Sequence, residues 1–124
     1  MSNSETLHED PQQLAPETID KHRAIASIME ELEAVDWYAQ RVDATADPAL
    51  KEILAHNRDE EKEHAAMVLE WLRRKDAKMD GFLRTYLFTD APITAIEKAA
   101  EGSGGEAGGA TEPGVLPIGS LKVR

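Results

Sequence analysis

The sequence predicts an all-α protein built on an antiparallel hairpin of two long helices, followed by a short C-terminal helix. Residues 17–44 and 49–77 contain neither glycine nor proline. In both stretches the apolar residues recur at steps of three and four, which is the period of an amphipathic helix. Only residues 45–47 and Pro48 separate the two stretches, and so short a connection makes neighbouring helices antiparallel.

The ends of the helices are marked by residues with known positional preferences. Pro16 with Glu17 opens the first helix, which should continue to about Ala44. Asp47 before Pro48 is typical of an N-cap followed by proline in the first helical position, and the second helix should reach about Ala77. Gly81 is expected to end that region, and residues 90–92 to start a shorter helix that reaches about residue 100.

Glycine divides the chain into a foldable part and a tail. Seven of the eight glycines lie at or after Gly102. The sequence therefore predicts a flexible segment over residues 1–16, a helical domain over 17–100 and a flexible linker over 101–114. Apolar residues return in 115–124, which favours a docking segment at the end of a tether. The alternative is a terminus that folds back on its own domain.

The charge and the residue types exclude several classes of function. The 124 residues carry 24 acidic and 14 basic side chains, a formal net charge of -10, which argues against nucleic acid and against an anionic membrane surface and favours cationic partners. Cysteine is absent, which excludes disulfides, cysteine-bound zinc and iron–sulfur clusters. The polar N-terminus and the short apolar runs indicate no signal peptide and no membrane span, so we expect a soluble cytosolic protein.

A lone hairpin leaves much of each helix uncovered. Helices of about 28 residues extend roughly 42 Å, and a core of two helices is marginal for stability. We therefore expect the chain to associate with itself before any function is considered.

Polar side chains interrupt the apolar faces of both helices near their middle. The first helix presents Glu31 and Tyr38 between apolar residues, and the second presents Asn57, Glu61 and His64. A buried carboxylate without a partner is costly, so these positions call for a compensating cation. A surface ion pair or a salt-bridge network between the helices is the alternative, although these faces contain no arginine or lysine.

Glu61 and His64 form a Glu-x-x-His motif, whose spacing places the two side chains on one side of a helix turn. Di-iron carboxylate bundles use a glutamate from each of two helices and this motif from each of two others. One chain offers half of that ligand set and half of a four-helix bundle. Two-fold association would complete both, and carboxylates with imidazole favour iron or manganese.

Two further polar groups share a helix face at steps of three and four. Each group is either a solvated acidic face, which is the usual case, or a site that attracts metal ions and passes them on. The first comprises Glu30, Glu33 and Trp37, and the second comprises His56, Glu60 and Glu63.

Residues 29–38, 56–65 and 84–89 resemble the encapsulated ferritins, which are ferritin-like cargo proteins of encapsulin nanocompartments. The likeness covers about residues 17–98. The terminal stretch 116–122 is similar to the peptides that tether cargo to the inner wall of the encapsulin shell.

The resemblance implies a ferroxidase, which oxidises Fe(II) to Fe(III) with oxygen at a di-iron centre between two subunits of a ferritin-like four-helix bundle. It implies that Glu31, Glu61 and His64 of both chains bind iron and that Tyr38 lies beside the centre. It further implies a ring of five dimers inside an encapsulin shell in the cytoplasm, with the shell storing the mineral. Glu30, Glu33 and Trp37 match a metal entry path, and His56, Glu60 and Glu63 match an accessory site for Ca²⁺ or another divalent ion.

Two other functions compete with this one. The first is a helical adaptor that binds Ca²⁺ or other divalent ions for structure alone, against which His64 counts because calcium takes oxygen ligands. The second is a di-iron redox enzyme that acts on an organic substrate, for which so short a bundle has little room.

Overall fold

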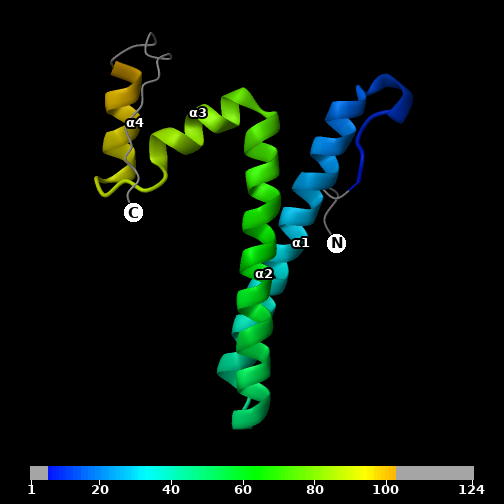
Figure 1. Ribbon diagram of the computed structural model, residues 1–124, viewed down its shortest axis with the longest axis vertical. Helices are drawn as coiled ribbons and strands as arrows, with labels where there is room; N and C mark the ends of the chain where they lie inside the picture. The colour runs from blue at the N-terminus through cyan, green and yellow to red at the C-terminus, as the bar shows by residue number, and fades with distance from the viewer. Residues whose placement is uncertain (1–5, 103–124) are drawn as a thin grey trace. The chain divides into compact units, whose positions relative to one another are not determined.

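The computed structural model describes residues 6–102, and every long element in this range is an α-helix, which confirms the predicted class. The order is a 3-10 helix η2 followed by four α-helices (Figure 1), namely α1 (Pro16–Ala44), α2 (Pro48–Lys75), α3 (Ala77–Tyr86) and α4 (Ile93–Gly102), with η2 at Pro11–Gln13. The chain divides into two compact units, one ending at Lys75 and the other beginning at Asp76. This boundary lies inside the segment 17–100 that the sequence predicts as one domain.

In the first unit, α1 and α2 pack against each other as an antiparallel hairpin (Figure 1). Asp47 caps α2 as predicted, because its Oδ1 accepts hydrogen bonds from the backbone N–H of Ala49 at 2.9 Å and of Leu50 at 3.2 Å. The N–H of Asp47 donates to Thr45 Oγ1 at 3.2 Å, and Lys51 Nζ donates to the carbonyl of Val42. These bonds close the turn and fix the register of the two helices.

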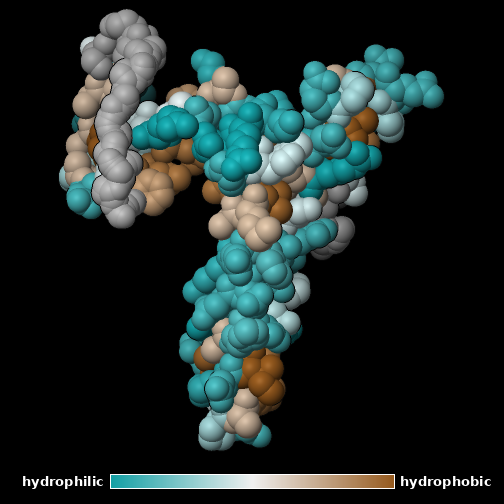
Figure 2. Space-filling view, in the orientation of Figure 1, coloured by the Kyte–Doolittle hydropathy of each residue, from teal (hydrophilic) through white to brown (hydrophobic). Residues whose placement is uncertain are grey.

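The core of the hairpin is thin. Among residues 6–102 the buried side chains are Ala24, Ala65 and Leu72, all of them apolar. Large apolar side chains stay exposed on both helices; they include Ile25, Leu32, Ile53 and Met67. Hydrophobic patches are visible on the hairpin in Figure 2. Exposed apolar patches are typical of interaction surfaces, and self-association of the hairpin stays a prediction.

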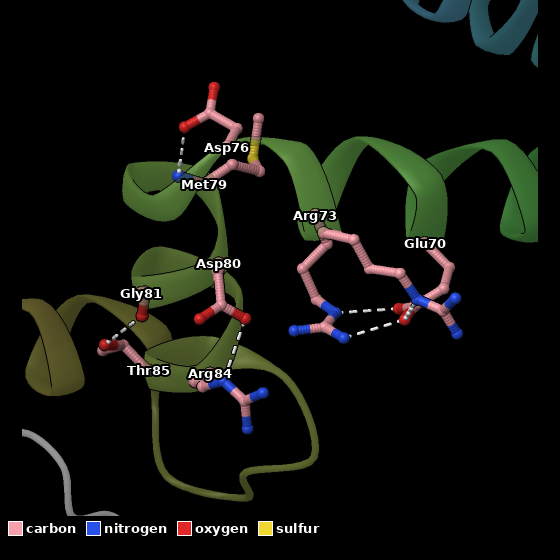
Figure 3. A network of polar contacts seen from close by, with 9 residues as sticks. Glu70, Arg73, Asp76, Met79, Asp80, Gly81, Arg84 and Thr85 are labelled. Carbon is pink, nitrogen blue, oxygen red and sulfur yellow. Dashed lines mark hydrogen bonds and ion pairs between the residues drawn. The ribbon is translucent and has the colours of Figure 1, made fainter.

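The sequence does not predict the helix α3: the second helix is expected to reach about Ala77, close to its observed end at Lys75, and Gly81 to end that region. The break comes earlier, after Lys75, because Asp76 Oδ1 accepts a hydrogen bond from the N–H of Met79 at 3.0 Å and so caps a new helix (Figure 3). Gly81 lies in the middle of α3, next to the ion pair between Asp80 and Arg84 at 2.9 Å. A glycine inside a helix costs about 1 kcal/mol, which the cap and the ion pair offset.

In the described part of the second unit, α4 follows α3 and contacts it. Between them Phe88 has a φ of 62°, in the left-handed region, and Thr89 Oγ1 donates to the carbonyl of Tyr86 at 2.7 Å. The helix starts directly after Pro92, as predicted, and reaches Gly102, slightly beyond the expected end at Ala100.

The predicted docking segment at 115–124 and all of the predicted linker beyond 102 lie outside the described residues, as do residues 1–5. Over the described range, none of the helices combines the length and the apolar character needed to cross a bilayer. The association of two hairpins into a four-helix bundle stays a prediction.

Candidate metal centre

Two helices bring the three predicted ligands together. Glu31 from α1 and Glu61 and His64 from α2 each offer a donor atom, and these atoms lie within 4.8 Å of one another. His64 Nδ1 is 3.3 Å from Glu61 Oε1 and 3.7 Å from Glu31 Oε1. Within residues 6–102 no other set of three or more acidic or histidine side chains meets this criterion.

The register of the hairpin explains the meeting. Glu31 and Glu61 are equally far from residue 46 in the turn, since 46 − 31 and 61 − 46 are both 15. Folding at Asp47 therefore brings the two carboxylates level with each other. His64 follows Glu61 by three residues and so joins them from the same face of α2.

The cluster is open on one side. The exposed fractions of the side chains are 27% for Glu31, 25% for Glu61 and 46% for His64. The sequence places these residues in a buried seam, whereas a single hairpin covers them only in part. A second surface is needed to enclose them.

The three groups shift one another's pKa values. The neighbouring Glu61, which accepts a hydrogen bond from Glu31, raises the pKa of Glu31, and loss of hydration adds to this effect. The same hydrogen bond lowers the pKa of Glu61. The hydrogen bond to Glu61 raises the pKa of His64. The two carboxylates and the imidazole are thus close enough to perturb one another, and a divalent cation at the same place would bind all three.

Tyr38 is not part of this group within one chain. It follows Glu31 by seven residues on α1, about 10.5 Å along the axis. Its ring lies under the guanidinium of Arg41, whose Cζ is 5.6 Å from the ring centroid.

The predicted entry residues lie on the surface of α1. Glu30 and Glu33 are exposed, and Trp37 is 49% exposed. Trp37 lines a shallow hollow together with Gln40, Arg41 and Ala44. The structure does not gather these three predicted residues into a set of donor atoms.

The predicted accessory residues are brought together only in part. His56 Nε2 lies 3.9 Å from Glu60 Oε2, while Glu63 is exposed one turn further along α2. Glu60 makes a contact that the sequence reasoning missed, because its Oε1 lies 3.8 Å from Nε2 of His64. The spacing of four residues between Glu60 and His64 on a helix could have signalled it.

The chain is similar to a family model and to several known proteins. The sequence model of the EncFtn-like family matches residues 6–90. An encapsulated ferritin-like protein of Rhodospirillum rubrum is 66% identical over 97% of this chain and 90% of its own length. A ferritin-like protein of Thermotoga maritima is 52% identical over 86% of this chain and 93% of its own.

Two further matches extend the likeness to a more distant relative and to a solved fold. An encapsulin nanocompartment cargo protein of Myxococcus xanthus is 34% identical over 77% of this chain and 79% of its own. A crystal structure of a Nitrosomonas europaea protein, 63% identical, has a TM-score of 0.68 and covers 70% of this chain and 96% of that one. On these matches the chain belongs to the EncFtn-like family of encapsulated ferritins.

Proposed function

We propose that the protein is a ferroxidase that oxidises Fe(II) to Fe(III) with oxygen at a centre shared by two subunits. The observation that carries the proposal is the cluster of Glu31, Glu61 and His64, which offers two carboxylates and an imidazole from one face of the hairpin. Carboxylate oxygens with an imidazole nitrogen suit iron among the common transition metals. Iron is the substrate here.

Charge balance favours two chains over one. A pair of Fe(II) ions carries four positive charges, and Glu31 and Glu61 of two chains supply four negative ones, with two neutral imidazoles completing the donor set. One chain supplies half of this. The open side of the cluster and the exposed apolar residues around it support pairing with a second copy.

The residues have separable tasks in this reaction. Glu31 and Glu61 bind Fe(II) as carboxylates and His64 binds it through the Nδ1 lone pair, so any proton on these atoms is released when the ion binds. Each Fe(II) gives one electron, so a pair reduces one O2 by two electrons, and two protons complete the hydrogen peroxide that leaves. Carboxylates can bind in bridging or terminal fashion, which allows Glu31 and Glu61 to hold both oxidation states and then release Fe(III).

The remaining roles follow the family resemblance. Tyr38 lies beside the completed centre, Glu30, Glu33 and Trp37 line the path of entry, and His56, Glu60 and Glu63 hold a further divalent ion such as Ca²⁺. The names of the Rhodospirillum and Myxococcus relatives support a cargo of an encapsulin shell, to which residues 115–124 would dock and inside which the mineral would be stored. The assembly would be a ring of five dimers.

Stopped-flow absorbance of Fe(II) mixed with air-saturated buffer tests the proposal. We expect Glu31→Gln and His64→Ala to slow ferric formation at least about tenfold, because the first removes a negative charge and the second an imidazole donor from both halves of the centre. Glu52→Gln is the matched control, since Glu52 is an exposed acid on α2, two turns before Glu60. Circular dichroism should show unchanged helix content in all three.

Oxidation at the wild-type rate in Glu31→Gln or His64→Ala would refute the proposed centre. An absence of ferric absorbance in the wild-type protein, together with tight binding of divalent ions, would instead identify a metal-binding adaptor without catalysis.

A further inference from the structure

The two ring nitrogens of His64 face different acids. Nδ1 lies toward the metal-binding cluster, 3.3 Å from Glu61 and 3.7 Å from Glu31. Nε2 lies on the opposite edge of the ring, 3.8 Å from Oε1 of Glu60. Glu60 precedes His64 by four residues on α2, so the backbone keeps the two side chains next to each other.

A histidine that binds a metal through one nitrogen usually donates the hydrogen on the other to a carboxylate, which fixes both its tautomer and its orientation. With Nδ1 turned toward the cluster, the hydrogen of the neutral ring belongs on Nε2. The carboxylate that the structure places beside Nε2 is that of Glu60, whose Oε1 is 3.8 Å away.

We propose that Glu60 is a positioning residue for His64, which accepts the Nε2–H hydrogen bond and holds the Nδ1 lone pair toward the metal. This inference rests on the proposed metal centre. The Glu60 side chain is 48% exposed, so it has room to rotate and shorten the present separation to a hydrogen bond. Its second oxygen, Oε2, faces Nε2 of His56 at 3.9 Å, which leaves Oε1 for His64.

A negative charge near the centre would also strengthen cation binding without positioning anything. Glutamine separates the two effects, because Glu60→Gln removes the charge and keeps a carbonyl oxygen that can accept from Nε2–H. Glu60→Ala removes both. A positioning role predicts rescue by glutamine, and a role of charge alone predicts that the two variants are equally impaired.

Titration of the metal-free full-length protein with Co(II), followed by visible absorbance, measures the effect. All proteins carry His56→Ala, so that the cluster of His56 and Glu60 does not compete for the ion. We expect Glu60→Ala to weaken Co(II) binding about 10- to 100-fold, Glu60→Gln to remain within about threefold of the parent, and the control Glu52→Ala to match the parent.

Nitrogen-15 spectra of the histidines give a readout apart from affinity. In the Zn(II)-loaded protein the Nε2 resonance of His64 should move in Glu60→Ala and be largely retained in Glu60→Gln. Parent-like Co(II) affinity in Glu60→Ala, or equal weakening in the alanine and glutamine variants, would overturn the inference.

The variant His64→Ala distinguishes a failure of the positioning role from a failure of the proposed metal centre. If His64→Ala abolishes Co(II) binding while Glu60→Ala leaves it intact, only the positioning role is wrong. If His64→Ala binds Co(II) as the parent does, both the positioning role and the proposed centre are wrong.

Discussion

Glu31 and Glu61 are two acids held side by side with one imidazole and no arginine or lysine among the contacts that define the cluster. The neighbouring Glu61 and the loss of hydration raise the pKa of Glu31, so the ionised form of this one side chain is disfavoured in the metal-free fold. The hairpin nevertheless keeps Glu31 next to Glu61. Binding of a cation gives the reason for it.

This cost can be measured in the protein without metal. We expect Glu31→Gln to raise the melting temperature of the chelator-treated protein at pH 7, since a neutral side chain replaces an ionised carboxylate next to Glu61. Differential scanning calorimetry in EDTA makes the comparison, with Glu52→Gln as the control that should not change. A lower melting temperature for Glu31→Gln would mean that the cluster stabilises the apoprotein.

At the level of single residues, the sequence singles out the three side chains that the hairpin brings together, whose role as metal ligands stays a prediction. Glu31, Glu61 and His64 follow from the interruption of apolar helix faces and from the Glu-x-x-His spacing, and the hairpin brings them together. The contact of Glu60 with His64 depends on side-chain rotation, which periodicity does not specify. Periodicity also does not predict the open side of the cluster, because helix spacing does not specify how much of a side chain a neighbouring helix covers.

Among the elements, the bounds of α1 and α2 are set by residues close to the helix ends. Asp47 provides two hydrogen bonds to the first turn of α2 and sets the register that brings Glu31 level with Glu61. We expect Asp47→Ala to lower the free energy of unfolding by about 1 kcal/mol, through the loss of the cap. Urea unfolding followed by circular dichroism gives this number.

Asp43 offers the control for that measurement, as an exposed aspartate in the last turn of α1. An acid at the C-terminal end of a helix is unfavourable, so Asp43→Ala should leave stability unchanged or slightly increased. Equal losses in the two variants would show that the cap of Asp47 has no special role.

The C-terminal end of α2 carries an ion-pair network whose pH dependence can be predicted (Figure 3). Glu70 accepts from Arg73 through two hydrogen bonds of 2.8 Å and from Arg74 at 2.7 Å, and these partners lower its pKa to about 2 from 4.5. Because the pKa is lowered in the folded state, the stabilisation is present above pH 4.5 and is lost as the pH falls toward 2.

Thermal melts of the wild-type protein and of Glu70→Gln between pH 7 and pH 3 test this dependence. The wild-type protein should melt higher at pH 7 by a small margin, since the groups are exposed, and the margin should shrink as the pH falls. A margin that grows on acidification would contradict the assigned ion pairs.

The helices α3 and α4 show where element prediction from sequence reaches its limit. Pro92 correctly predicts the start of α4. Gly81 wrongly predicts a helix end inside α3, because glycine usually indicates the end of a helix. The decisive signal is Asp76 three residues before Met79, whose N–H it accepts. A cap and a glycine give opposite local signals, and only their combined energies decide between them.

On the scale of the whole molecule, the hairpin leaves many apolar side chains exposed. Only Ala24, Ala65 and Leu72 are buried among the described residues, whereas Ile53 and Met67 on α2 are more than half exposed. The proposed pairing with a second hairpin would cover both this apolar surface and the open side of the cluster. Sequence periodicity predicts that such a surface exists, but it does not determine which surfaces of two copies meet.

The C-terminal segment should act apart from the metal centre. We expect deletion of residues 115–124 to abolish loading into a co-expressed encapsulin shell and to leave the rate of iron oxidation in solution unchanged, because no predicted ligand lies in this segment. Co-purification with the shell and stopped-flow oxidation are measured on the same protein. Equal loading of the shortened chain would remove the docking role.

Native mass spectrometry with anaerobic Fe(II) examines the shared centre most directly, since it counts ions on each oligomer separately. With His56→Ala to remove the proposed accessory site, we expect bound iron only on assemblies with an even number of chains, with two ions for every two chains and none on the monomer. Monomers that carry a full pair of Fe(II) ions would contradict it, because a single chain would then hold a complete centre.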